Sequence, residues 1–183
     1  MRTVLVLSLL IFSPNVFAQS PSGGLKQIDA SISRHYPSLE KLYTHLHQNP
    51  ELSQKEEKTS ATMAGELKSL GFDVFEKVGG YGVAGVLKNG AGPTVLIRTD
   101  MDALPIEETT GLPYASKARS TNGAGAEVGV MHACGHDIHM TVFVGTARAL
   151  VECRKLWNGT LVMIAQPSEE NGIGARAMLN DGL

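Results

Sequence analysis

Residues 93–166 contain the succession that decides the fold: PTVLIRTD at 93–100, a helical pattern from Asp137 to Lys155, and TLVMIAQ at 160–166. The two outer segments are short apolar runs typical of strands, and the middle segment has the length of a helix. Because a crossover of this length joins parallel strands, we expect a parallel pair inside an α/β sandwich.

Upstream of this succession, the hydrophobic period predicts two more strands. The runs are FDVFEKV at 72–78 and YGVAGVLK at 81–88, which are separated by Gly79 and Gly80. Asn89-Gly90 predicts a hairpin turn before PTVLIRTD. We therefore expect three strands in series.

Two helices are expected before these strands. The first spans about residues 25–49, and Pro37 is expected to divide it into two pieces. The second is expected to open with a capping box formed by Ser53 and Glu56 and to end at Gly71. Both helices are interpreted as scaffold that packs on the core.

Residues 1–18 have the composition of a secretory signal peptide. Arg2 precedes an apolar run from Val4 to Phe12, and the residue types at Val16 and Ala18 predict cleavage after Ala18. The run is shorter than the ~20 residues that cross a bilayer, so we expect no stable membrane anchor after cleavage. The sequence therefore predicts a periplasmic or secreted protein.

Composition argues against a nucleic-acid-binding protein. The chain has 183 residues, and its 16 basic and 18 acidic side chains give a net charge of −2 without a basic cluster. A small-molecule substrate is expected instead. Residues 19–183 show no second domain boundary and stop shortly after a predicted helix start near Gly172, so we interpret them as the N-terminal part of a longer catalytic domain.

Three polar segments adjoin the predicted strands and the helix: RTDMDALP at 98–105, MHACGHDIH at 131–139 and QPSEEN at 166–171. In α/β sheets, ligands bind beyond the carboxyl ends of strands. We therefore expect the three segments to converge in one crevice.

Cys134 and His136 are candidate metal ligands. A loop with Gly135 between them can direct both side chains at one ion, and thiolate and imidazole are ligands that zinc-like metals prefer. A structural disulfide between Cys134 and Cys153 is the alternative, because an oxidising compartment would allow it. Cys153 lies on the predicted helix, where it is equally explained as a small buried apolar residue.

Acidic residues complete the predicted site. Hydrolysis at a metal needs one carboxylate that holds the ion and another that takes a proton from water, and Glu169 and Glu170 can divide these roles. Two solvated glutamates at a helix start are the alternative. Asp100 and Asp102 are expected to orient a ligand imidazole, with turn formation as the alternative.

A further polar group, HLHQNPE, contains His45, His47 and Glu51. Helix termination explains it about as well as catalysis does. We assign none of its residues a catalytic role.

Taken in order, LHQNPELSQKE, RTDMDALPI, MHACGHDIH and QPSEEN closely resemble motifs of the M20 family of metallopeptidases and amidohydrolases. The match is to the branch with hippurate, N-acyl-amino-acid and auxin-conjugate amidohydrolases, and it runs from about Leu39 to the end of the chain. The resemblance implies a zinc-exopeptidase-like catalytic domain with a central mixed β-sheet flanked by helices. It also implies a smaller lid domain and dimer contacts beyond residue 183, and thus a homodimer for the full-length protein.

The resemblance also implies the metal ligands. Two divalent ions, of zinc, manganese or cobalt, are expected, with Cys134 as the bridging ligand and with His136 and Glu170 as terminal ligands. Glu169 would be the general base. Two more histidine ligands are expected beyond the present end of the chain, so we expect the 183-residue chain alone to be inactive.

Orienting roles fall to three aspartates. Asp102 matches the orienting aspartate of the family, and Asp137 is placed beside the ligands as a further orienting residue. Asp100 stands where many relatives have a histidine ligand, and it is expected to support the ligands rather than to bind metal.

The function that follows is hydrolysis of the amide bond in N-acyl amino acids or related small conjugates and peptides. Metal-bound hydroxide would attack the carbonyl, and Glu169 would move the proton. Two alternatives stay open. Cys134 could be a nucleophile activated by His136 or His139, and such an enzyme would survive chelation. The chain could also be an inactive or metal-binding exported domain.

Overall fold

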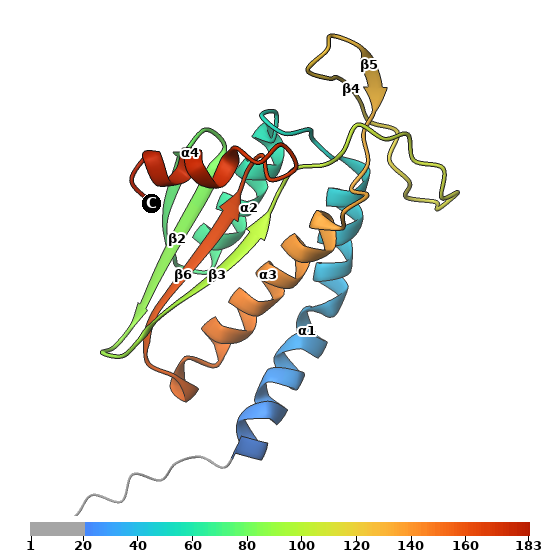
Figure 1. Ribbon diagram of the computed structural model, residues 1–183. Coiled ribbons are helices and arrows are strands. Elements are labelled where there is room, and N and C mark those ends of the chain that lie inside the picture. The colour runs from blue at the N-terminus through green and yellow to red at the C-terminus, as the bar shows by residue number, and fades with distance from the viewer. Residues whose placement is uncertain (1–20) are drawn as a thin grey trace, which may run out of the picture.

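The computed structural model describes residues 21–183 and shows a mixed sheet with helices packed against it (Figure 1). The expected signal peptide at residues 1–18 lies outside the described residues. In chain order the elements are α1 (Pro21–Gln48), α2 (Glu57–Ser69), β1 (Asp73–Val78), β2 (Gly82–Asn89), β3 (Thr94–Asp100), β4 (Arg119–Thr121), β5 (Glu127–Gly129), α3 (His136–Glu152), η1 (Arg154–Leu156), β6 (Gly159–Gln166) and α4 (Gly174–Asn180). No helix within residues 21–183 is long and apolar enough to span a bilayer.

The main sheet has the strand order β1-β2-β6-β3, with β6 in its interior. β6 pairs in parallel with β3 and antiparallel with β2, which confirms the predicted parallel pair and the mixed sheet. The register places Asp100 beside Gln166, so the two parallel strands end at the same edge. Helices α2 and α3 pack on the sheet, and α1 packs on α3 (Figure 1).

The turn at Asn89-Gly90 does not close a hairpin, and that prediction was wrong. β2 and β3 are not neighbours, because β6 inserts between them. The Asn89 side-chain amide donates hydrogen bonds to the carbonyls of Arg154 and Trp157, which precede β6. These bonds attach the turn to the segment that leads into β6, and β1 and β2 form the hairpin of the sheet instead.

Pro37 does not divide the first helix, and this prediction was also wrong. α1 is continuous from Pro21 to Gln48 with Pro37 inside it. The proline is exposed, so water can bond the carbonyl that loses its helical donor. Leu39, Leu42 and Leu46 are buried in the core, and this packing stabilises the helix despite the proline.

The predicted capping box at the start of α2 is absent, and the prediction was wrong. No side chain caps the helix from Glu56, and the Ser53 hydroxyl donates to Asp102 instead. The Glu51 carboxylate accepts the N–H groups of Lys58 and Thr59 in the first turn. At the other end, Gly71 has a φ of 81°, the left-handed conformation that ends many helices, as expected.

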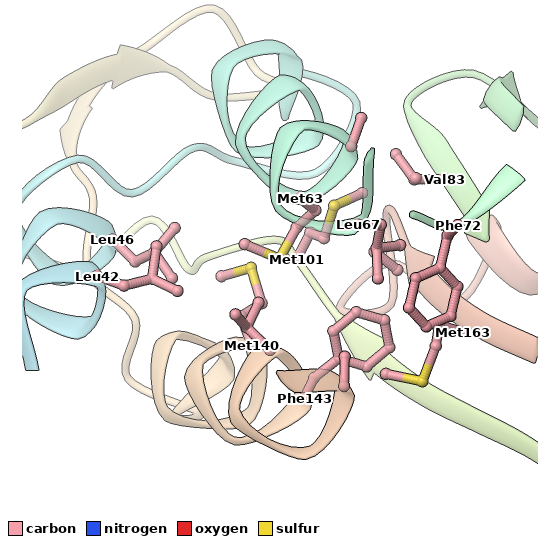
Figure 2. Close-up of a cluster of buried hydrophobic side chains, with 14 of the residues drawn as sticks. Leu42, Leu46, Met63, Leu67, Phe72, Val83, Met101, Met140, Phe143 and Met163 are labelled. Atoms are coloured by element: carbon pink, nitrogen blue, oxygen red, sulfur yellow. The ribbon is translucent and has the colours of Figure 1, made fainter. Parts of the chain in front are cut away.

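The core between the sheet and the helices is rich in methionine (Figure 2). Met63, Met101, Met140 and Met163 are all fully buried in it. Methionine is unbranched and flexible, which lets it fill irregular space between elements. Met101 precedes Asp102, so the packing of the core holds the end of the β3 segment in place.

Residues 101–135 leave the sheet and return to it, and the small β4–β5 pair forms part of this excursion (Figure 1). Leu52, Ala103 and Val130 form a buried cluster of their own at its base. Leu104 and Met131 bond to each other through their backbones. This pairing brings the residues before α3 back to the edge where β3 and β6 end.

Candidate metal centre

Three segments meet beyond the carboxyl ends of β3 and β6. Asp102 follows β3, Glu169 and Glu170 follow β6, and His136 is the first residue of α3. Hydrogen bonds join all three segments through Asp102. The predicted convergence of the three polar segments is therefore confirmed.

Asp102 is the residue on which the other segments converge, and only 1% of it is exposed. One carboxylate oxygen accepts the N–H of Glu169 at 3.0 Å, and the other accepts the N–H of Glu170 at 3.0 Å. The second oxygen also accepts the Ser53 hydroxyl at 2.6 Å. These bonds fix the backbone of the glutamate pair, a role that the sequence did not reveal.

His136 is buried and has one defined tautomer. Its Nδ1 lies 2.7 Å from the Asp102 carbonyl oxygen, which can only accept a hydrogen bond, so Nδ1 carries the proton. Nε2 of the neutral ring then has a free lone pair. It lies 3.8 Å from Oε2 of Glu169 and 3.9 Å from Oε1 of Glu170.

These three side chains form a donor set suited to a divalent cation. His136, Glu169 and Glu170 each offer a ligand atom, and these atoms lie within 4.8 Å of one another. Oε1 of Glu170 is buried and has no hydrogen-bond partner within residues 21–183. A buried carboxylate oxygen without a partner is costly, and a bound cation would satisfy it. The residues therefore fit a metal ion.

Cys134 is exposed at the edge of this donor set, two residues before His136. A hydrogen bond to Glu170 raises the pKa of the Cys134 thiol, and the negative charges of Glu170, Glu169 and Asp102 act in the same direction. A cation among these carboxylates would reverse the effect, because a coordinating thiol loses its proton. Within the described part of the chain, no hydrogen bond joins Cys134 to a histidine that could activate it.

The alternative disulfide between Cys134 and Cys153 does not form, because both thiols are free. Cys134 precedes α3 and Cys153 follows it. The helix has 17 residues, which separates its ends by roughly 25 Å at 1.5 Å per residue. Cys153 is buried, as expected for a small apolar residue.

Comparison with known proteins agrees with this geometry. Residues 96–183 match the model of peptidase family M20/M25/M40. The hippurate hydrolase of Campylobacter jejuni is 43% identical over 146 residues, which are 79% of this chain and 35% of that relative. The chain belongs to the M20 family.

Two further relatives are similar to this chain over most of its length. The IAA-amino acid hydrolase ILR1-like 2 of Arabidopsis thaliana is 37% identical over 186 residues, with 97% of this chain and 40% of the relative covered. The solved structure of YXEP, a dinuclear metal-binding M20 peptidase of Bacillus subtilis, matches with a TM-score of 0.70 at 36% identity. It covers 84% of this chain and 40% of YXEP. The M20 chain spans about a third of the length of the first curated relatives.

The other two predicted orienting residues of the M20 site have different partners. Asp100 ends β3 and forms an ion pair with Arg98 at 3.1 Å. Asp137 follows His136, but its carboxylate lies 2.7 Å from Nδ1 of His47. Asp137 thus orients His47, a residue that was assigned no role from the sequence.

His47 belongs to a buried charge cluster beside the candidate metal centre. Its Nδ1 faces Asp137 and its Nε2 lies 3.1 Å from Glu108. Burial lowers the pKa of His47, but the hydrogen bonds to the two carboxylates outweigh it and leave the pKa above its usual value. Glu108 also accepts the Thr110 hydroxyl and the Ser116 N–H, so the cluster holds the 101–118 segment against α1 and α3. In the sequence, the polar segment that contains His45 and His47 was the signal that could have indicated this cluster.

Two other histidines of MHACGHDIH flank the centre. His132 is buried, neither of its ring nitrogens has a partner within residues 21–183, and burial lowers its pKa to about 4. It is therefore neutral at pH 7. His139 is exposed, and its ring centroid lies 6.0 Å from that of His136.

Proposed function

We propose that this protein hydrolyses the amide bond of N-acyl amino acids or related small conjugates and peptides, with two divalent metal ions. The observation that carries the proposal is the Glu169–Glu170 pair, which Asp102 fixes through the backbone beside the free Nε2 of His136. The names of two relatives, hippurate hydrolase and IAA-amino acid hydrolase, support an amide between an acyl group and an amino acid as the bond attacked.

Cys134, His136 and Glu170 would hold the ions. Zinc, manganese and cobalt suit this combination of sulfur, nitrogen and oxygen donors. When bound, such ions polarise the carbonyl and lower the pKa of water. Asp102 would leave the Nε2 lone pair of His136 free to bind an ion, because its carbonyl fixes the tautomer.

Glu169 would take the proton from the attacking water and return it to the leaving nitrogen. The two glutamates differ in a way that supports this division of roles. The side chain of Glu169 is 40% exposed, whereas that of Glu170 is 16% exposed and holds the unpartnered oxygen. Glu169 is therefore the carboxylate that water and substrate can reach, and Glu170 is the one that needs a cation.

The test compares Glu169→Gln with Glu170→Gln in the full-length protein, loaded with zinc, manganese or cobalt. Glu169→Gln is expected to lower turnover of an N-acyl amino acid panel about 10²- to 10⁴-fold, as loss of a general base does, with metal content near normal. Glu170→Gln is expected to lower metal content, measured by elemental analysis. Glu57→Gln, an exposed carboxylate on α2, is the matched control and should change neither quantity.

Two results would contradict the proposal. The first is the opposite assignment, in which Glu169→Gln loses metal and Glu170→Gln keeps it, or full activity of both variants. The second is activity that survives chelation but is lost in Cys134→Ser. That outcome would favour the cysteine nucleophile.

A further inference from the structure

Glu56 is a buried acid that contacts the segment carrying the glutamate pair. It precedes α2, and none of its surface is exposed. One of its oxygens accepts the N–H of Ser168 at 2.7 Å and lies 3.1 Å from the Ser168 hydroxyl. The backbone N–H of Gln54 donates to the same hydroxyl at 2.9 Å. The hydroxyl hydrogen is therefore directed at Glu56.

Ser168 needs such contacts because its backbone is strained. Its φ is 53°, in the left-handed region that is unfavourable for a residue with a Cβ atom. Its carbonyl accepts the N–H of Gly174 at 3.1 Å. The N–H, the hydroxyl and the carbonyl of Ser168 are thus all bonded, which is the situation in which strained residues persist.

The conformation of Ser168 sets the direction of the next two residues. Glu169 and Glu170 point their N–H groups at the two oxygens of Asp102 immediately after it. We propose that Glu56 is a positioning residue for the Glu169–Glu170 pair, and that it acts by holding Ser168 in this conformation. The inference rests on the proposed function, which gives the pair its chemical role.

Stability does not account for an acid at position 56. Its second oxygen is buried and has no hydrogen-bond partner in the described part of the chain. Burial raises the pKa of Glu56, so the folded protein opposes its charge. A cavity of about 280 Å³, lined in part by Glu56, Ser168 and Tyr81, lies beside it. A group that costs free energy in this way, and whose hydrogen bonds to distant residues go to Ser168, is explained by the segment that it positions.

The first readout is amide hydrogen exchange without metal. In Glu56→Ala, the amides of Glu169 and Glu170 are expected to exchange about tenfold faster, because their bonds to Asp102 open more often. Amides inside β6 should keep their rates. Glu56→Gln retains an oxygen acceptor and should restore most of the protection, and Glu57→Ala, the exposed neighbour, should match the wild type. Unchanged exchange at both glutamates, or a uniform increase across the sheet, would overturn the proposal.

The second readout is Co²⁺ binding by the full-length protein, which visible absorption monitors. Loss of an outer contact commonly lowers metal affinity 10- to 100-fold, so Glu56→Ala is expected to bind Co²⁺ about tenfold more weakly, and Glu57→Ala as tightly as the wild type. If the wild type itself does not bind Co²⁺, the proposed function fails, and the exchange experiment still decides the role of Glu56.

A variant of Ser168 tests the same link if Glu56→Ala misfolds. Ser168→Ala removes the hydroxyl from the same contact without removing a charge from the interior. It should reproduce faster exchange at Glu169 and Glu170. Wild-type exchange rates in a folded Ser168→Ala protein would count against the link between Glu56 and the pair.

Discussion

A single residue, Asp102, contacts both the Glu169–Glu170 pair and His136. Its carboxylate binds the backbone of Glu169 and Glu170, and its carbonyl fixes the tautomer of His136. An asparagine would present an NH₂ group to one of the two N–H donors, so only a carboxylate accepts both. The proposed proton-transfer group, Glu169, and the proposed ligand, His136, are therefore positioned by the same residue.

His47 gives the protein a stability that depends on pH. Its folded pKa is raised above the usual 6.5, so the charged ring stabilises the fold fully below pH 6.5, and this contribution is lost as pH rises through the folded pKa. We expect the difference in unfolding free energy between wild type and His47→Gln to be larger at pH 6 than at pH 9. Urea denaturation at both pH values measures it.

His45→Gln is the control for this prediction. His45 lies on the same helix, two residues earlier, but it is exposed. Its replacement should change stability little at either pH. An equal loss in His47→Gln at pH 6 and pH 9 would show that the ring acts only by packing or by neutral hydrogen bonds.

At the scale of elements, sequence patterns predicted where most helices and strands lie but not how their ends are bonded. Gly71 ends α2 as expected, because a left-handed glycine is a local requirement. Ser53 was expected to cap α2, yet its hydroxyl bonds Asp102, a residue 49 positions away. Pro37 remains inside a helix because tertiary packing outweighs the local penalty. The spacing of residues along the chain does not reveal hydrogen bonds to such distant partners.

The contacts of Glu51 at the start of α2 can be tested by mutation. The Glu51 carboxylate accepts the N–H of Lys58 at 3.2 Å, and it accepts both the N–H and the hydroxyl of Thr59 at 2.8 Å. Glu51→Ala is expected to lower the unfolding free energy by about 0.5–2 kcal/mol, as loss of a helix cap does. Glu51→Gln keeps one acceptor oxygen and should lose less. Equal stability of Glu51→Ala and wild type in urea denaturation would contradict the capping role.

At the scale of the whole molecule, the convergence of the site was predictable and the strand order was not. Apolar runs at 94–100 and 160–166 predicted a parallel pair, and parallel strands place Asp102 and Glu169 at one edge. Asn89-Gly90 is a strong local turn signal, but β2 pairs with β1 and β6 and not with β3. The contacts of Glu56, Asp137 and His47 depend on that arrangement, so spacing along the chain could not reveal them.

We propose that the protein is exported and that its mature form begins at Gln19. Val16 and Ala18 occupy the positions before the cleavage site, which signal peptidases require to be small. Mass spectrometry of the protein recovered outside the cytoplasm should give a mass without residues 1–18. Ala18→Trp is the matched control and should keep them. Recovery of exported wild-type protein that retains Met1 would contradict the proposal.

The interior position of β6 determines when the molecule can fold. β6 pairs with β2 across sequence separations from 70 residues, Asn89 to Gly159, to 82 residues, Val83 to Ala165. Pairings between such distant segments form slowly, because the chain loses the entropy of closing a long loop before the favourable contacts form. Until residue 166 has been synthesised, β2 and β3 lack their shared neighbour, and Glu169 and Glu170 cannot reach Asp102. A nascent chain therefore cannot bring Asp102, Glu169 and Glu170 together until β6 and the residues that follow it have been synthesised.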